Sequence, residues 1–242
     1  LPSYEEIPIA CEMDEAVETE YKRIEHKLVQ VLRSDRRAAQ KILSAYLNLL
    51  TVYPDQPYDQ KPILYPDSDV PIVEPKNIGA ADTLGEKELR TLEIVRAAIQ
   101  NRERTLIYTS WVRTDSQQKL KKLLTDEGYR TEILTDKIKT TDREDWVQKK
   151  LAAGMQVLIV NPSLVETGLD LNAFTTLVFY SMGYKLFTLR QASRRSWRIN
   201  QKAPAVKVYM LYYEDTMQQK CLKLMASKLA VAGLIEGNFS EE

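Results

Sequence analysis

The chain has 242 residues, of which 44% are hydrophobic, enough to bury one core together with a smaller attached part. Its 34 lysines and arginines balance its 34 aspartates and glutamates, so the overall charge indicates neither a nucleic-acid nor a membrane partner, and any such signal must be local. Two distant cysteines, Cys11 and Cys221, exclude a disulfide framework and a zinc site, and we expect a reducing, cytoplasmic setting.

The N-terminal segment, residues 1–16, is acidic and lacks the basic and apolar regions of a signal peptide. No segment approaches the roughly eighteen consecutive apolar residues that cross a bilayer, so we expect no membrane partner. The chain begins with Leu and not with Met, which favours a fragment of a longer protein.

Two amphipathic helices are predicted next. Apolar residues recur at steps of three and four over residues 13–31, and the pair Ser34-Asp35 offers an N-cap for a second helix with an apolar stripe over residues 42–50. This pattern indicates a helical hairpin. Six of the ten prolines follow in residues 54–75, which argues against any regular element there and predicts a surface loop at a domain boundary.

Short apolar runs alternate with amphipathic segments from Gly85 onward. We predict helices over residues 86–101, 115–128, 142–154, 187–199 and 217–234, and strands over residues 105–111, 131–135, 156–162, 175–181 and 205–213. This alternation predicts an α/β fold, an open parallel sheet with helices on both faces, preceded by the helical hairpin.

Ligands of such sheets bind beyond the carboxyl ends of the strands. Three loops there have distinctive compositions: YTSW (residues 108–111), NPSLVETGLDLN (161–172) and the segment with QASRRSWRINQ (191–201).

The third segment is an acid-free basic stretch. No Asp or Glu occurs between Leu171 and Tyr213, and helical spacing places Gln191, Arg195 and Arg198 on one face. Guanidinium groups on a common face fit phosphate oxygens. A solvated basic helix, or arginines paired with acids elsewhere in the fold, explains the same pattern.

In the second loop, Gly168 permits a positive φ or a close backbone approach, and Asp170 supplies a carboxylate for a ribose hydroxyl or an arginine. A simple turn and a local cap are the alternative. The chain has no phosphate-binding G-x-x-x-x-G-K-[ST] loop, and none of its apolar strands ends in the Asp-Glu pair that would hold magnesium. Its one histidine, His26, is expected at the surface. The chain alone therefore cannot cradle a triphosphate.

The segments TLIYTSW, VLIVNPSLVETGLDLN and QASRRSWRINQ, in this order, resemble motifs IV, V and VI of superfamily-two helicases. The pattern Q-A-x-x-R-x-x-R-x-x-Q is most similar to that of the Swi/Snf-related DNA translocases. The opening residues 1–24 resemble the linker and first helix of that branch's second half, AYLNLLTVYP resembles its L-R-x-x-x-x-H-P segment, and LGEKELRTLEIV its S-x-K-x-x-x-L helix. The resemblance implies two parts: residues 1–78, a linker strand, helical hairpin (protrusion) and proline-rich loop, and residues 79–242, a RecA-like helicase C-terminal lobe.

The resemblance also implies roles at a nucleotide. In this family a separate N-terminal RecA-like lobe carries the phosphate-binding loop and holds most of the ATP with Mg, and the second lobe supplies arginines. By this likeness Arg198 is the arginine finger, Arg195 is its neighbour on the phosphate, and Gln191 orients them, with Gly168 and Asp170 beside the nucleotide. The lobe alone is expected to be inactive, and it has no metal site of its own.

A DNA strand is expected along motifs IV and V. The resemblance makes Thr109, Ser110 and Thr167 candidate hydroxyl contacts to phosphates and places Trp111 near the groove, although an aromatic at a strand end is also explained by packing. Ser110 stands where the family commonly has Gln, and Glu166 puts a negative charge near the expected DNA track.

The function implied is the C-terminal half of an ATP-dependent double-stranded DNA translocase that meets its own N-terminal lobe and DNA. Its location would be cytoplasmic, at the nucleoid, or nuclear in a eukaryote. Two alternatives stay open: a strand-separating DNA or RNA helicase lobe, and a non-catalytic module that docks nucleic acid or protein.

Overall fold

The computed structural model describes residues 3–110, 116–166, 168–181, 196 and 203–237, with side chains up to residue 227. Its centre is a six-stranded sheet in the order β1-β8-β7-β4-β6-β5, and every neighbouring pair is parallel. The strands are β1 (Ser3–Cys11), β4 (Thr105–Tyr108), β5 (Thr131–Leu134), β6 (Val157–Val160), β7 (Thr176–Phe179) and β8 (Ala205–Tyr213).

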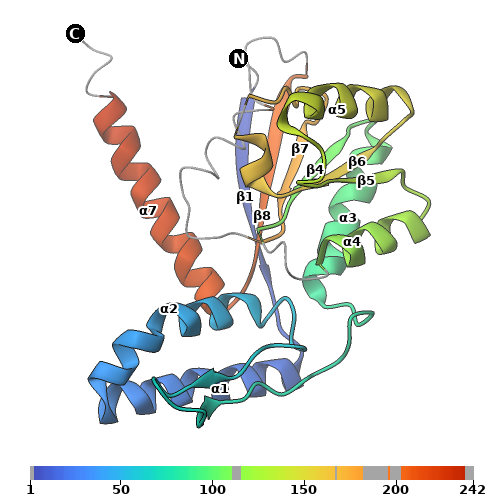
Figure 1. Cartoon of the computed structure of the whole chain (residues 1–242). Coiled ribbons are helices and arrows are strands. Elements are labelled where there is room, and N and C mark those ends of the chain that lie inside the picture. Colours follow the sequence, from blue (N-terminus) through green and yellow to red (C-terminus); the bar gives the residue numbers. More distant parts are fainter. Residues whose placement is uncertain (1–2, 111–115, 167, 182–195, 197–202, 238–242) are drawn as a thin grey trace.

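Helices cover both faces of this sheet, as predicted (Figure 1). Side chains of α3 (Glu86–Gln100) and α4 (Ser116–Asp126) share one core with Ile107, Ile159 and Val178, whereas α5 (Arg143–Ala152) packs on the opposite face with Leu106 and Leu158. Alternate strand residues point to opposite faces, and every residue of β4, β6 and β7 is buried. These three strands are therefore covered on both faces, which explains why their sequences are almost entirely apolar. The α/β fold is thereby confirmed.

The helical hairpin is also confirmed. Its helices are α1 (Glu15–Ser34) and α2 (Arg36–Val52), and they enclose a core of their own around Ile24 and Tyr46. The Tyr46 hydroxyl donates to the Ile24 carbonyl at 2.6 Å, so the polar end of this buried ring has a partner. Figure 1 places the hairpin at the end of β1 that leads into α1.

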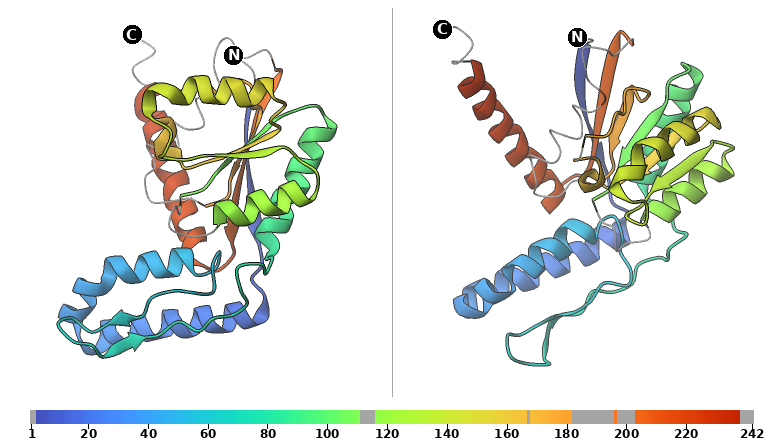
Figure 2. Two further views of the ribbon diagram at one scale, coloured as in Figure 1. Left: turned by 45° about the vertical axis from the view of Figure 1, so that its right-hand side comes forward. Right: turned by 45° about the horizontal axis from the view of Figure 1, so that its top comes forward.

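The proline-rich segment contains one regular element that the sequence analysis did not predict. β2 (Ile63–Leu64) pairs antiparallel with β3 (Pro71–Val73), and in both views of Figure 2 the chain between α2 and α3 runs alongside the hairpin. The expectation of no regular element is therefore wrong here. Pro71 is the first residue of its strand, a place where a strand tolerates the missing N–H.

One strand of the sheet, β1, belongs to the segment before the predicted domain boundary at residues 78 and 79. β1 pairs with β8 over its whole length, from Ser3 opposite Ala205 to Cys11 opposite Tyr213. After β8, helix α7 (Met217–Gly237) begins against the hairpin, where the Met217 N–H donates to the Tyr21 hydroxyl at 2.8 Å. The hairpin is thus tied to the sheet at both ends of the chain, and the division at residues 78 and 79 stays a prediction.

Two short 3₁₀ turns complete the description, at Thr140–Asp142 and Pro162–Val165. None of the helices in the described part of the chain is long and apolar enough to cross a membrane.

We expect Asp35→Ala to lower the free energy of unfolding by about 1 kcal/mol, because the Asp35 carboxylate accepts the Ala38 N–H at 3.0 Å and caps α2. Urea unfolding followed by circular dichroism measures this loss. Asp35→Asn keeps an acceptor at the cap and serves as the matched control, expected to stay within a few tenths of a kcal/mol of the parent. Equal losses in both variants would contradict the capping role.

Candidate nucleotide and nucleic-acid site

The strand register brings two of the three predicted loops to one edge of the sheet. Tyr108, the last residue of β4, lies opposite Val160 of β6 on one side and Phe179 of β7 on the other. The residues that follow these three strands therefore leave the sheet side by side, at its carboxyl edge, where ligands of parallel sheets bind. Ser110, Asn161 and Ser181 meet there.

Ser110 is the centre of this meeting. Its N–H donates to Ser181 Oγ at 2.7 Å, and its own hydroxyl donates to the Ser181 carbonyl at 2.9 Å. Asn161 Nδ2 donates to the Ser110 carbonyl at 3.3 Å. The half-buried Ser110 is thus fixed at the edge of the sheet by residues of both neighbouring strand ends. Ser181 was missed by the sequence analysis, because the only signal was a lone Ser after an apolar run.

Thr109 has a different position from the one predicted. It is fully buried, its N–H donates to the Val160 carbonyl at 3.1 Å, and its hydroxyl accepts from Gln117 Nε2 of α4 at 2.8 Å. A hydroxyl without exposed surface cannot contact a DNA strand that lies on the surface of this structure. The predicted phosphate contact of Thr109 therefore conflicts with its burial. Thr109 instead connects the end of β4 to α4.

The turn after β6 shows the predicted backbone conformation at Gly168, with a φ of +103° that L-residues with side chains rarely adopt. Nothing lies within 4 Å of where a Cβ would be, so the described residues do not approach this glycine closely. Asp170 Oδ1 accepts the Asn172 N–H at 3.1 Å, which is the local cap considered as the alternative. The Asp170 N–H donates to Glu144 Oε2 at 2.9 Å, and α5 thereby holds the turn.

Ser196 connects the acid-free basic stretch to this turn. Its side chain is fully buried, and its hydroxyl donates to the Leu171 carbonyl at 3.0 Å. In the sequence Ser196 stands directly after Arg195 and two residues before Arg198. The predicted Gln191, Arg195, Arg198, Trp111 and Thr167 lie outside the described residues.

Arg143, at the start of α5, is a buried cation that the sequence analysis missed. Its Nε donates to the Ile138 carbonyl at 3.2 Å and its Nη1 to the Leu164 carbonyl at 3.0 Å. These carbonyls belong to the loops after β5 and β6, so Arg143 holds two neighbouring loops of the carboxyl edge together. The only signal for Arg143 in the sequence was its place in the first turn of a predicted helix, which does not indicate burial.

A second polar group lies where the hairpin meets the sheet. Lys87 Nζ of α3 donates to Asp55 Oδ1 at 2.7 Å, with both side chains almost wholly buried. The next residue, Glu88, pairs with Lys119 of α4 at 2.9 Å, also buried. The Lys87 ammonium lies 5.2 Å from the centre of the Tyr180 ring. We call Asp55, Lys87, Glu88 and Lys119 the junction charges.

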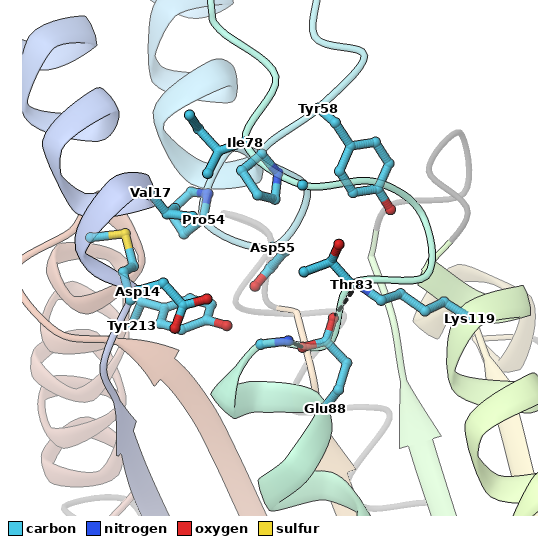
Figure 3. A pocket seen from close by; sticks show the side chains of 14 residues that line it. Asp14, Val17, Pro54, Asp55, Tyr58, Ile78, Thr83, Glu88, Lys119 and Tyr213 are labelled. Atoms are coloured by element: carbon cyan, nitrogen blue, oxygen red, sulfur yellow. Dashed lines mark hydrogen bonds and ion pairs between the residues drawn. The ribbon is translucent and has the colours of Figure 1, made fainter.

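A cavity of about 70 Å³ adjoins the junction charges (Figure 3). Hairpin and loop residues such as Val17, Pro54 and Tyr58 line one side, and Glu88, Lys119 and Tyr213 line the other. Burial raises the pKa of the Asp55 carboxyl, although the neighbouring Lys87 acts in the opposite direction. Within the described residues, no group of three His, Cys, Asp or Glu side chains is placed to hold a metal ion.

Comparison with known proteins finds one family model that matches part of the chain. The model of the helicase conserved C-terminal domain matches residues 87–200, which include β4, β6, β7 and most of the acid-free basic stretch. This part of the chain is similar to that family. An uncharacterized ATP-dependent helicase of Mycoplasma pneumoniae is 24% identical over 156 residues, which make up 64% of this chain and 15% of that protein. The chain thus corresponds to a small part of that relative.

Three solved structures share the fold of nearly the whole chain. The C-terminal part of the Fun30 ATPase domain has a TM-score of 0.67 at 14% identity, covering 93% of this chain and 89% of that one. The Sulfolobus solfataricus SWI2/SNF2 ATPase C-terminal domain has a TM-score of 0.65 at 17% identity, covering 93% and 86%.

The third is the core of the Sulfolobus solfataricus SWI2/SNF2 ATPase in complex with double-stranded DNA, with a TM-score of 0.66 at 19% identity, covering 96% of this chain and 45% of that one. Together these structures confirm the predicted RecA-like C-terminal fold with its preceding hairpin.

We expect Cys11 to resist alkylation, because burial raises the pKa of its thiol from 9.0 to about 12 and so lowers the thiolate fraction at pH 8 about a thousandfold. A Cys221→Ser variant leaves Cys11 as the one thiol, and iodoacetamide labelling followed by mass spectrometry measures its rate. Urea-unfolded chain is the control and should label at the rate of a free cysteine. Equal rates in the folded and unfolded chains would show that Cys11 is open to solvent.

Proposed function

We propose that this chain is the C-terminal RecA-like lobe of a Swi/Snf-related ATPase that moves along double-stranded DNA. The observation that carries the proposal is the hydrogen bond from Ser196 to Leu171. It joins the sequence segment of Arg195 and Arg198 to the turn beyond β6, at the carboxyl edge where parallel sheets bind ligands. A phosphate-binding role of these arginines explains why an acid-free basic stretch is held there.

In the proposal the nucleotide is ATP, bound with Mg. Hydrolysis of this ATP drives the movement along DNA. This chain has no phosphate-binding loop, and its described residues offer no metal-holding cluster, so its arginines fit a partial site completed by an N-terminal lobe of the same protein. In the proposal Arg198 contacts the γ-phosphate, Arg195 lies beside it, and Gln191 orients them. Gly168 and Asp170 shape the turn next to the nucleotide, and the isolated chain is inactive.

The DNA track in this proposal follows the strand ends. Ser110 is half-buried at the carboxyl edge and is the described candidate for a phosphate contact, with Trp111 and Thr167 as further candidates. The buried Thr109 positions the neighbouring Ser110 through its hydrogen bonds with Val160 and Gln117. Contacts of this kind are made to phosphates and not to bases. DNA binding is therefore expected to be independent of the DNA sequence and weakened by salt.

The proposal draws on the double-stranded DNA bound to the related Sulfolobus solfataricus core, a protein that shares the fold at 19% identity. A motor that acts on DNA would lie in the cytoplasm, at the nucleoid or in a nucleus.

In the complete protein, we expect Arg198→Ala and Arg198→Lys to lower ATP turnover by about three to five orders of magnitude while ATP binding stays within a few fold. An arginine finger acts on the charge of the transition state, which a shorter or differently shaped side chain cannot reach. Steady-state turnover and nucleotide titration measure the two quantities. Arg33→Ala, an exposed arginine at the end of α1, is the control. Unchanged turnover in Arg198→Ala would remove this residue from the site.

The complete protein is expected to displace the third strand of a DNA triplex with ATP and to leave a plain duplex paired, because a translocase follows the duplex without separating it. Triplex displacement and duplex unwinding are measured under the same salt. Duplex unwinding would favour the strand-separating helicase, and absence of ATP turnover with DNA would favour the docking module.

A further inference from the structure

The junction charges join the hairpin to the sheet by burying four charged side chains, which costs hydration free energy. Side chains of Asp55 and Lys87 retain 3% and 1% of their exposure, and those of Glu88 and Lys119 retain 2% and 8%. Buried ion pairs lose hydration that their attraction often only offsets, and apolar residues of similar volume frequently serve stability as well. Stability alone therefore does not explain four buried charges in one place.

The cavity beside these charges shows what they do for the junction. It separates the hairpin side, with Val17 and Pro54, from the sheet side, with Glu88 and Tyr213 (Figure 3). Where packing is open, close apolar contact cannot set how the two sides lie relative to each other. The ion pair between Asp55 and Lys87, which has a fixed length and direction, crosses at this point.

One path from the junction charges reaches Thr109. Glu88 pairs with Lys119 in the first half of α4, and Gln117, two residues earlier on the same helix, donates to the Thr109 hydroxyl at 2.8 Å. The position of Glu88 on α3 is therefore transmitted through α4 to the end of β4 by one buried ion pair and one hydrogen bond.

A second path reaches Ser110. The Lys87 ammonium lies over the Tyr180 ring, and the next residue, Ser181, makes two hydrogen bonds with Ser110. Lys87 and Glu88 are neighbours at the start of α3, so both paths begin at the same helical turn. The Thr109–Ser110 segment is thus held from two sides by residues that depend on the contact with the hairpin.

The far end of the junction is fixed to the hairpin. The Asp55 N–H donates to the Val52 carbonyl at 3.0 Å, at the end of α2. Gln218 of α7 donates to the Thr51 carbonyl at 2.9 Å, within the last turn of that helix. A displacement of α2 therefore moves Asp55 with it.

We propose that the junction charges are a positioning device that couples the helical hairpin to the Thr109–Ser110 segment and so sets how firmly the lobe holds DNA. The DNA part of this inference rests on the proposed function, whereas the mechanical coupling does not. The four residues are positioning residues, because they act on the DNA through Thr109 and Ser110 and do not touch it.

The test replaces the crossing ion pair with an apolar pair, Asp55→Leu/Lys87→Met, in the complete protein. The expected result is amide hydrogen exchange about tenfold faster at Thr109 and Ser110, with unchanged exchange in the middle of α1 and an unchanged unfolding midpoint. The DNA concentration that half-maximally stimulates ATP turnover rises about tenfold, and DNA-free turnover stays within about twofold. A residue that only supports stability would move the unfolding midpoint and leave this selective pattern absent.

The matched control is Lys41→Met/Asp67→Leu, which removes an exposed ion pair between α2 and the loop that joins β2 to β3. It is expected to change none of these quantities. Glu88→Gln/Lys119→Met is the second variant, should the first double variant fail to fold. It removes both charges of the first path, keeps an acceptor for the Gly85 N–H, and is expected to act in the same direction.

Unchanged exchange at Thr109 and Ser110 in a folded variant would overturn the coupling. Faster exchange with unchanged DNA half-saturation would overturn the role in holding DNA. Absence of DNA-stimulated turnover in the unaltered complete protein would overturn the proposed function and the DNA part of this inference, and the exchange measurement would still decide the coupling.

Discussion

The pairing of β4 with β6 on one side and β7 on the other is the constraint on which the rest of this structure depends. It aligns three strand ends so that their following residues emerge together. Because all three strands are parallel and buried on both faces, their ends cannot shift without breaking two apolar cores at once. The strand ends from which the polar group around Ser110 emerges are aligned for this reason, although Ser110 and Ser181 lie some 70 positions apart in the sequence.

Around this fixed edge, the described loops are held by side chains from the neighbouring helices. Glu144 and Arg143 of α5 secure the turn and loops beyond β5 and β6, and Gln117 of α4 secures the end of β4. The proposed function requires such rigidity, since arginines contribute to a reaction only when they are already in place. The bond from Ser196 to Leu171 extends the same framework to the basic stretch.

The hairpin is attached in a contrasting way. Its own core is apolar, but it meets the sheet through β1, through the start of α7, and through an ion pair beside a cavity. A junction of directional contacts around open space can take up small displacements that a packed core would resist. In the proposed coupling, the hairpin transmits such displacements through the junction charges to the Thr109–Ser110 segment, whereas the paired strands keep their alignment.

The candidate site could be predicted only in part, and the reason differs from residue to residue. The loops beyond β4 and β6 and the positive φ at Gly168 followed from local composition. The burial of Thr109 did not, because whether a hydroxyl at a strand end faces solvent depends on which helix covers it, here α4 with Gln117. Ser181 and Arg143 acquire their roles from partners that only the folded chain brings near.

By itself, the sequence determined the elements whose signal is local: the helical periodicity of α1 and α2, the Asp35 cap between them, and the apolar runs of the central strands. Only the tertiary structure decided that residues 3–11 add a strand beside β8, that Ile63–Leu64 and Pro71–Val73 pair, and that Asp55 reaches Lys87. Periodicity and capping energies act between residues a few positions apart. Strand pairing and buried charges depend on contacts between distant segments, whose free energy no single segment carries.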